Sequence, residues 1–498
     1  MTSMIPCSDY DLAQDSCLYR LPDHSWLSCS IENPKFRPNL TQMSQITCIG
    51  AGYVGGPTMA LSALHCPEHD FTVVDINEER IQRWSSDNLP IYEPSLLEVV
   101  RQARGRNLFF SNDIPTAIQQ ADIIFVAVNT PTKTFGEGAG KAADLQYWEK
   151  TARDILTHAR QPEVIVVEKS TLPVRTAEAM SRILSSGSSH SRFSVVSNPE
   201  FLAEGTAIPD LQEPDRVLVG GEENEFGRRA ARTIADLYGH WVAEDRVLLT
   251  NVWSSELSKL VANAMLAQRI SSINSISALC ERTQANIVEI SRAIGMDRRI
   301  GPHFLQASIG FGGSCFRKDI LHLSYLCEYY GLPEVADYWA SVVRINEFQT
   351  DRFFRNILKQ QINTLAGKKI TLFGFAFKPD TGDTRDSPAI PLCRKLLSEH
   401  AQVRVHDPRA REETEHDLAS MEGDIAFVED PYEAAYGAHA VALVTQWQQY
   451  RDLDYGRILE NMMRPAYLFD GRNHLDHQYL FNLGYNVFPL GSAPLTHL

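Results

Sequence analysis

The chain has 498 residues, of which 44% are hydrophobic and 22% charged, and its formal net charge is −15. This length exceeds one ordinary core and predicts two or three globular domains. The negative charge argues against nucleic acid or an anionic membrane as the main partner, although a local site can still be positive. No apolar run approaches the roughly 20 residues of a membrane-spanning helix, so we expect no membrane partner.

The nine cysteines are scattered, without a Cys-x-x-Cys pair or a Cys/His cluster. This pattern is typical of a reducing compartment and predicts no metal site. The polar, acidic start of the chain resembles neither a secretory signal nor an arginine-rich presequence, so we expect a cytoplasmic protein. Residues 1–43 lack sustained periodicity, and we interpret them as an extension without assigned chemistry.

A glycine-rich turn opens the first regular pattern. The β-rich run 45–49 leads into Gly50-Ala-Gly-Tyr-Val-Gly55, a helical pattern follows over 57–64, and a second β-rich run, 71–74, ends at Asp75. A lone G-x-G-x-x-G is weak, but strand, motif, helix, strand and acid in this order favour a dinucleotide site over a packing turn.

Each part of this pattern has a physical role. The first glycine permits the tight turn, the second lets the backbone meet a pyrophosphate, and the third allows close helix packing. The helix N-terminus attracts the phosphates. Asp75 would bind the ribose hydroxyls and repel a 2′-phosphate, which predicts NAD over NADP. The turn residues expected to line NAD are Gly50, Gly52, Tyr53, Val54 and Gly55.

Three further apolar runs, 121–128, 164–167 and 192–196, are typical of buried parallel strands. Ligands of such sheets lie beyond the carboxyl ends of the strands. Any one polar residue there could be a helix cap, but their shared placement favours a site. The residues on this expected rim are Thr130, Thr171, Glu200 and Glu204.

A long helical pattern covers about 254–281, and its length suggests a spine that joins domains or subunits. Lys259 and Asn263 lie four residues apart and therefore project from one face. They could donate hydrogen bonds to developing negative charge. The alternative is a lysine that reaches solvent beside an ordinary, satisfied asparagine.

The segment 308–319 has three glycines before Cys315, and Arg317, Lys318 and Asp319 after it. We expect the two cations to stabilise a thiolate, which favours a reactive cysteine. Asp319 could serve as a base or orient a water. The alternative is a buried structural thiol, the usual state of a free cysteine.

Strands and helices alternate again near the C-terminus, over 368–375, 389–399, 402–406 and 440–444. This second set has no G-x-G-x-x-G, so it can hold a nucleotide only in another way, with Lys378 and Arg385 as the natural phosphate-facing cations. The predicted fold class is α/β, with two Rossmann-like doubly wound domains joined by a long central helix and a helical middle domain. The expected parts are the extension 1–43, a NAD-binding domain 44–250, a central helical domain 251–360 and a second nucleotide-binding domain with the tail, 361–498.

Taken together, these motifs resemble those of the UDP-glucose/GDP-mannose dehydrogenase family, the nucleotide-sugar 6-dehydrogenases, over about 44–475. The run Leu-Ala-Gln-Arg-Ile-Ser-Ser-Ile-Asn-Ser at 266–275 points to its UDP-glucose branch. The resemblance rests on the stretches 50–55, 168–171, 198–204, 259–263, 310–319 and 374–385.

This resemblance implies an NAD-dependent four-electron oxidation of UDP-glucose at C6 to UDP-glucuronate, with two NAD and one water. Cys315 would form a thiohemiacetal and then a thioester, while Lys259 and Asn263 steady the C6 oxyanion. Asp319 and Glu200 would assist hydrolysis through an ordered water. Thr171 is assigned to the same water and proton network.

The resemblance also implies two sets of binding residues and a homo-oligomer, either a dimer or a hexamer. The expected NAD contacts are Asp75, Arg80, Thr130, Ser170, Thr171, Glu204, Lys318 and Arg385. The expected UDP-sugar contacts are Glu200, Phe201, Leu202, Glu204, Lys259, Asn263, Arg299 (lent by a neighbouring subunit), Phe304, Gly312, Phe377, Lys378 and Arg472. Gln306 departs from the lysine that animal members carry at this position.

Two alternatives stay open. The first is a 6-dehydrogenase for another sugar nucleotide, GDP-mannose or a UDP-aminosugar. The second is a non-catalytic regulator that binds NAD and a UDP-sugar. Loss of Cys315, Lys259 or Asp319 would indicate a regulator, and all three are present.

Overall fold

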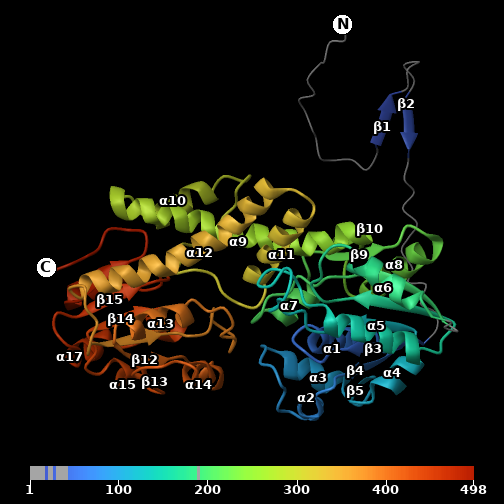
Figure 1. Ribbon diagram of the computed structural model, residues 1–498, viewed down its shortest axis with the longest axis horizontal. Coiled ribbons are helices and arrows are strands. Elements are labelled where there is room, and N and C mark those ends of the chain that lie inside the picture. Colours follow the sequence, from blue (N-terminus) through green and yellow to red (C-terminus); the bar gives the residue numbers. More distant parts are fainter. Residues whose placement is uncertain (1–16, 21–25, 30–42, 188–190, 498) are drawn as a thin grey trace, which may run out of the picture.

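The computed structural model describes residues 17–20, 26–29, 43–187 and 191–497 (Figure 1). Strands β1 (Cys17–Arg20) and β2 (Trp26–Cys29) pair antiparallel. Residues 1–16, 21–25 and 30–42 of the predicted extension lie outside the described residues. In the described part of the chain, no helix is both long enough and apolar enough to cross a membrane.

The first sheet has eight strands in the order β10-β9-β8-β7-β6-β3-β4-β5. Its six strands from β5 to β8 are parallel, in the doubly wound order 3-2-1-4-5-6, and β9 pairs antiparallel with β8. The strands are β3 (Gln45–Ile49), β4 (Asp70–Val74), β5 (Leu108–Ser111), β6 (Ile123–Val126), β7 (Glu163–Glu168), β8 (Arg192–Ser197), β9 (Val217–Gly221) and β10 (Val247–Asn251).

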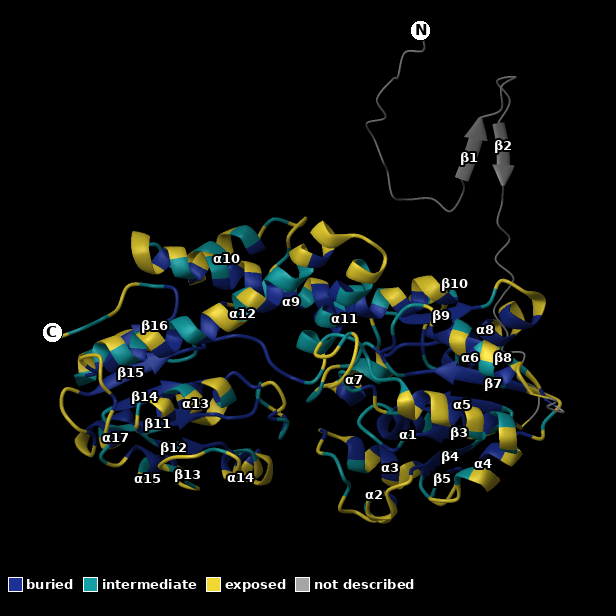
Figure 2. Cartoon of the chain, in the orientation of Figure 1, coloured by how far each residue is buried: buried dark blue, intermediate teal, exposed yellow. Residues whose placement is uncertain are grey.

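Helices cover this sheet, and its central strands are buried (Figure 2). Short polar side chains begin several of these helices: Asn77, Asp113 and Asn224 accept hydrogen bonds from the first turns of α2, α4 and α8. The helices are α1 (Gly55–His65), α2 (Glu78–Trp84), α3 (Leu96–Ala103), α4 (Ile114–Gln120), α5 (Gln146–His158), α6 (Thr176–Leu184), α7 (Ala207–Gln212) and α8 (Glu225–Tyr238).

The second sheet has six parallel strands in the order β13-β12-β11-β14-β15-β16, which is again 3-2-1-4-5-6. Its strands are β11 (Lys369–Phe373), β12 (Gln402–His406), β13 (Ile425–Phe427), β14 (Ala440–Leu443), β15 (Tyr467–Asp470) and β16 (Asn486–Pro489). Its helices are α13 (Ala389–Ser398), α14 (Arg411–Ala419), α15 (Pro431–Ala435), α16 (Gln448–Arg451), α17 (Tyr455–Glu460) and α18 (His477–Leu483). The predicted fold class, two doubly wound domains with a helical middle, is confirmed.

A helical layer connects the two sheets, which occupy separate lobes in Figure 1. Helix α9 (Val252–Thr283) starts directly after β10, where Asn251 accepts a hydrogen bond from Ser254 N at 2.8 Å, and extends from one lobe toward the other. Helices α10 (Ile287–Gly295), α11 (Phe316–Tyr329) and α12 (Pro333–Gln360) complete the layer, with α11 and α12 packed against α9. This layer places the predicted cysteine segment between the lobes.

Candidate active site

The glycine turn after β3 has the geometry that a dinucleotide needs. Gly50 has φ +112°, and a Cβ there would lie 2.4 Å from the Ala127 carbonyl oxygen. A Cβ on Gly55 would lie 2.1 Å from the Gly50 oxygen, so neither position accepts a side chain. Among the described residues, a Cβ on Gly52 would meet no atom within 4 Å. The open side of the turn therefore fits a pyrophosphate at the N-terminus of α1.

Asp75 holds this turn in place. Its carboxylate accepts hydrogen bonds from the backbone N–H groups of Ala51 and Asn77, each at 2.9 Å, and from Arg80 Nη1 at 3.1 Å. Asp75 is 8% exposed and sits at the end of β4. The structure thus shows Asp75 bracing the glycine turn, and its expected contact with the ribose hydroxyls of NAD stays a prediction.

The carboxyl ends of β6 and β7 meet beside the turn. Thr130 Oγ1 donates to the Thr171 carbonyl at 3.1 Å, and Ser170 Oγ donates to the Val128 carbonyl at 2.6 Å. Thr130 and Thr171 are both buried. The structure thus brings these rim residues together, as expected for ends of adjacent parallel strands.

Cys315 directly precedes α11, in a loop packed against the second lobe. A Cβ on Gly312 would lie 2.5 Å from the Asp386 oxygen, and Gly313, at φ +86°, donates its N–H to the Arg385 carbonyl at 2.8 Å. Both glycines are therefore required for the cysteine loop to approach the loop after β11 closely.

The charges around the thiol differ from the sequence expectation. Solvent reaches Cys315, but protein surrounds it closely enough that loss of hydration, followed by the Asp319 carboxylate, raises the pKa of the thiol. Lys259 and Lys318 oppose this effect without reversing it. Arg317 forms an ion pair with Glu347 at 2.6 Å instead. The prediction of a stabilised thiolate is wrong for the free protein, because burial outweighs the cations.

Three pairs of polar side chains lie beside the thiol, on α9, on α11 and on the loop after β8. Asn263 donates to Asp319 Oδ2 at 2.6 Å, and Lys318 Nζ lies 3.1 Å from Asp319 Oδ1. On the same face of α9, Lys259 Nζ lies 3.6 Å from Glu200 Oε1. The spacing of Lys259 and Asn263 predicted their shared face, but their carboxylate partners are too distant in sequence to be paired from spacing.

Phe201 is enclosed by two cations. The Arg216 guanidinium stacks 3.8 Å from the centre of its ring, and Lys259 Nζ lies 5.3 Å from the same centre. Glu93, buried, accepts hydrogen bonds from the N–H groups of Gly205 and Ala207 and so fixes the next part of this loop, with Tyr53 Oη accepting from Gly205 N at 3.1 Å. Sequence reasoning missed Arg216 and Glu93, which lie outside every motif.

The second lobe contributes cations at the ends of its strands. Arg472 follows β15, is 7% exposed and donates through Nη2 to the Phe377 carbonyl at 3.2 Å. Burial lowers the pKa of Arg472 to about 10 and also lowers the pKa of Lys378, whose Nζ lies 5.6 Å from the Phe377 ring centre. Arg472, which is buried, and Lys378, which is half-buried, form no ion pair with a described carboxylate, so they fit an anionic ligand such as a diphosphate.

Glu204 connects the two lobes. Its carboxylate accepts a hydrogen bond from Thr381 Oγ1 at 3.3 Å and pairs with Arg385 Nη2 at 3.3 Å. Burial, and then the nearby Asp383 carboxylate, raise the pKa of Glu204 to about 7. Asp383 binds Arg385 more closely, at 2.6 Å. The residues predicted on both sheets therefore meet at one contact.

Sequence reasoning also missed a pair of buried carboxyl groups next to the site. Glu256, one turn before Lys259, accepts hydrogen bonds from the N–H groups of Arg175 and Ala177 at 2.7 and 2.8 Å and so caps α6. Burial beside this neighbour raises the pKa of Glu168 well above its usual value, and burial raises that of Glu256 to about 7. Glu168 begins the stretch 168–171 that carries part of the resemblance, whereas the sequence signal for Glu256 is its spacing from Lys259.

Some predicted residues are not brought into this cluster. The Arg299 side chain is 89% exposed and pairs with Asp297 at 2.7 Å, and Phe304, at φ +60°, is 41% exposed. Leu202 is half-buried near Phe201, and Gln306 is exposed. The UDP-sugar contacts predicted for Leu202, Arg299 and Phe304 stay predictions, and so does the effect of Gln306 on substrate binding.

A dinucleotide turn, a thiol between two lobes and a second nucleotide-type sheet with cations near its strand ends are the parts of a pyridine-nucleotide-dependent dehydrogenase. The same class follows from comparison with known families. Residues 44–242 match the NAD binding domain of the UDP-glucose/GDP-mannose dehydrogenase family, 253–348 its central domain and 371–477 its UDP binding domain. The chain belongs to this family.

Individual relatives agree. The chain is 54% identical over 467 residues to UDP-glucose 6-dehydrogenase 5 of Oryza sativa subsp. japonica, covering 90% of this chain and 97% of that protein. It is 52% identical over 468 residues to UDP-glucose 6-dehydrogenase 1 of Arabidopsis thaliana, with the same shares. A solved UDP-glucose dehydrogenase from Pyrobaculum islandicum is 31% identical, with a TM-score of 0.79 over 92% of this chain and 100% of that one.

Proposed function

We propose that this chain is an NAD-dependent dehydrogenase that oxidises C6 of UDP-glucose to the carboxylate of UDP-glucuronate, with two NAD and one water. One observation carries the proposal. Cys315 lies at the junction of the two lobes, close enough to Lys259, Lys318 and Asp319 for all three to act on its pKa. A packing thiol needs no such surroundings, whereas a nucleophile for an aldehyde does.

The Gly50–Gly55 turn would hold NAD, which would supply the hydride acceptor for both oxidations of C6. In the first, the C6 alcohol becomes an aldehyde, and its proton leaves through Lys259 and its partner Glu200, 3.6 Å away. The Cys315 thiol then adds to the aldehyde. Sulfur bonds to C6, and the thiol proton moves to the C6 oxygen. The raised pKa of Cys315 indicates a thiol that is protonated at rest, which suits this step.

The second oxidation converts the thiohemiacetal into a thioester. Lys259 and Asn263 stabilise the negative charge that develops on the C6 oxygen, and their buried positions strengthen this effect. Water then cleaves the thioester, which returns the thiol of Cys315 and gives a carboxylic acid that loses its proton. Asp319, held by Asn263 and Lys318, and Glu200 orient that water.

The decisive experiment counts NADH per sugar nucleotide consumed. We expect two NADH for each UDP-glucose, and UDP-glucuronate as the product. A ratio of one, or the absence of turnover, contradicts the proposal. GDP-mannose and UDP-N-acetyl-mannosamine at matched concentrations test the other branch, and we expect kcat/KM for both to be far below that for UDP-glucose.

We further propose a cytoplasmic homo-oligomer, a dimer or a hexamer. An apolar stripe along α9 supports it: Leu257, Met265, Ile276 and Leu279 are between 37% and 58% exposed. Such a stripe on a central helix is typical of a subunit interface. The exposed Arg299 could then reach a neighbouring site. Sedimentation at assay concentration tests this, and Met265→Glu should shift the protein toward the monomer.

A further inference from the structure

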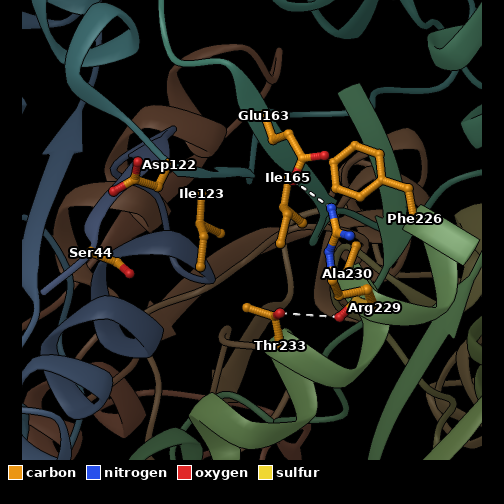
Figure 3. A pocket seen from close by; sticks show the side chains of 9 residues that line it. All are labelled: Ser44, Asp122, Ile123, Glu163, Ile165, Phe226, Arg229, Ala230 and Thr233. Atoms are coloured by element: carbon orange, nitrogen blue, oxygen red, sulfur yellow. Dashed lines mark hydrogen bonds and ion pairs between the residues drawn. The ribbon is translucent and has the colours of Figure 1, made fainter. Parts of the chain in front are cut away.

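Among the cavities in the described part of the chain, one lies away from the site and a second adjoins it. The first has a volume of about 180 Å³ and lies at the opposite end of the first sheet, between Asp122, Glu163 and Thr233. There Glu163 is already paired with Arg229 (Figure 3). The second cavity has a volume of about 130 Å³ and lies behind Glu200 and Phe201. Both are large enough for several water molecules.

The second cavity runs from the surface to the back of the site. Its outer residues Glu213 and Asp215 are exposed, whereas Asn198 at its inner end is fully buried and Glu200 is 7% exposed. The inner wall is polar, because Lys169 Nζ donates to Asn198 Oδ1 and to Tyr238 Oη, each at 3.1 Å. Water occupies a buried space when it has polar partners of this kind.

A single layer of side chains separates this cavity from the reacting groups. Arg216 lines the cavity and stacks on the Phe201 ring. Lys259 is not among the residues that line the cavity, and its Nζ lies 5.3 Å from the centre of the same ring. Glu200 is the second part of this wall. Its Oε1 is 3.6 Å from Lys259 Nζ, and its buried Oε2 has no hydrogen-bond partner in the described part of the chain.

We propose that this cavity, termed the rear chamber, supplies the water that hydrolyses the Cys315 thioester, delivered past Glu200. The inference rests on the function proposed above. In the step, water oxygen bonds to C6, the C6–sulfur bond breaks, and the two protons of the water go to sulfur and, through Glu200, to solvent. No oxidant or reductant is involved, because both hydrides have already left.

The charge of the rear chamber favours water over other occupants. Besides Glu200, its lining includes the carboxylates of Asp210, Glu213 and Asp215, against the cations Lys169 and Arg216. An acidic opening repels the anionic cofactor and sugar nucleotide but admits neutral water. A separate water route also has a chemical advantage: it allows the bound ligands to shield the aldehyde on the opposite side from bulk solvent.

The test fills the rear chamber without touching the reacting groups. Leu211 lines it, and its carbonyl accepts a hydrogen bond from Trp241 Nε1 at 2.9 Å, which a side-chain change leaves in place. Leu211→Phe and Leu211→Trp form a graded series. Thr233→Phe and Thr233→Trp fill the first cavity in the same way and serve as matched controls. Thermal midpoints of all variants identify those that fold.

The full-length enzyme is mixed with UDP-glucose and NAD, quenched at intervals, and the mass of the intact protein reports the thioester. We expect two NADH per site to form at the wild-type rate in every variant. The thioester should then decay about tenfold more slowly in Leu211→Trp, less so in Leu211→Phe, and at the wild-type rate in the Thr233 controls.

Unchanged decay in a folded Leu211→Phe or Leu211→Trp protein overturns the rear chamber as the water source, and so does equal slowing in the Thr233 controls. Failure of the proposed function itself looks different. In that case the wild-type protein forms no covalent adduct and does not release two NADH per UDP-glucose.

Discussion

The two doubly wound sheets share a strand order and the same turn after the first strand. In the first, Gly50 N–H donates to the Val74 carbonyl at 2.8 Å; in the second, Gly374 N–H donates to the His406 carbonyl at 2.8 Å. Both glycines have a positive φ, +112° and +96°, and a Cβ on either would collide with the chain that follows the fourth strand. In both sheets, a glycine thus allows the turn after the first strand to approach the chain after the fourth strand closely at the switch point.

An aspartate braces each turn. Asp75 follows β4 and binds the Ala51 N–H, and Asp407 follows β12 and binds the N–H groups of Phe375 and Ala376 at 2.7 and 3.0 Å. Asp407 also accepts from Trp447 Nε1 at 3.1 Å and from two further backbone groups. Its lone pairs are therefore used within the fold, whereas Asp75 retains capacity for a ribose.

The lobes differ in the segment that connects the turn to the next helix. In the first, α1 begins at Gly55 and presents its N-terminus to a pyrophosphate. In the second, a loop precedes α13 at Ala389, and it carries Lys378 and Arg385. Backbone N–H groups are therefore available to a phosphate in the first lobe, and cationic side chains in the second. The two lobes thus differ in the connection after the first strand and not in the order of their strands.

Chemistry should depend on the thiol between the lobes more than on either nucleotide site, so Cys315→Ser has the largest expected effect. A serine hydroxyl without an adjacent histidine base is a weak nucleophile, and alkoxide is a poorer leaving group than thiolate, so an ester hydrolyses more slowly than a thioester. We expect about one or two NADH per site and then a fall in steady-state rate on the order of 1,000-fold or more. Intact-protein mass spectrometry and a steady-state assay check this; sustained wild-type turnover contradicts it.

The same glycine-to-alanine substitution in each of the two turns tests whether the turns serve different ligands. Gly50→Ala places a Cβ 2.4 Å from the Ala127 oxygen, and Gly374→Ala places one 2.3 Å from Thr445 Cβ. With positive φ at both, we expect about 1–3 kcal/mol of strain in each. Gly50→Ala should lose NAD affinity and keep that for UDP-glucose, and Gly374→Ala the reverse. Calorimetric titration of each ligand measures this, and parallel losses would refute the division of roles.

Substitutions of the two bracing aspartates should also differ in their consequences for cofactor binding, with a smaller effect than the glycine substitutions. Asp75→Asn removes a charge that faces both the turn and the expected ribose, at a cost of about 1.5–3 kcal/mol for a charge-assisted hydrogen bond. We expect kcat/KM for NAD to fall about 10- to 100-fold and the preference for NAD over NADP to weaken. Asp407→Asn is the matched control and should lower the thermal midpoint while leaving the NAD/NADP ratio unchanged.

Local patterns predicted the fold and the first lobe well, because each element there depends on neighbours in sequence. The Gly50–Gly55 turn with Asp75, and the shared face of Lys259 and Asn263, follow from spacing alone. The brace at Asp407 was visible in principle, since it follows its strand as Asp75 does, but no glycine fingerprint drew attention to it.

The features that sequence did not predict depend on burial and on contacts between distant segments. The pKa of Cys315 is raised although two cations follow it in sequence, because the folded chain removes water and brings Asp319 close. Arg216 and Glu256 position the Phe201 loop and α6 through contacts made only after folding. Neither carries a local pattern that distinguishes it from an ordinary surface charge.

The smallest expected effect concerns the contact between the lobes at Glu204. Its pKa in the folded protein is about 7, against a usual value of 4.5. The folded state therefore binds a proton that the unfolded state has lost between these pH values, and stability decreases as pH rises through this window. Below pH 4.5 both states are protonated and the effect disappears.

Glu204→Gln removes this proton-binding difference while retaining an acceptor for Thr381. The thermal midpoint of the variant minus that of the wild type should therefore become more positive as pH rises from about 5 to 8. Other titrating groups, such as Glu168 and Glu256, are common to both proteins and cancel in the difference. The exposed Glu223 offers a control, since Glu223→Gln should give a difference that does not change with pH. A flat profile for Glu204→Gln would mean that Arg385 compensates the buried charge fully, and that ionisation of Glu204 does not weaken the contact between the lobes.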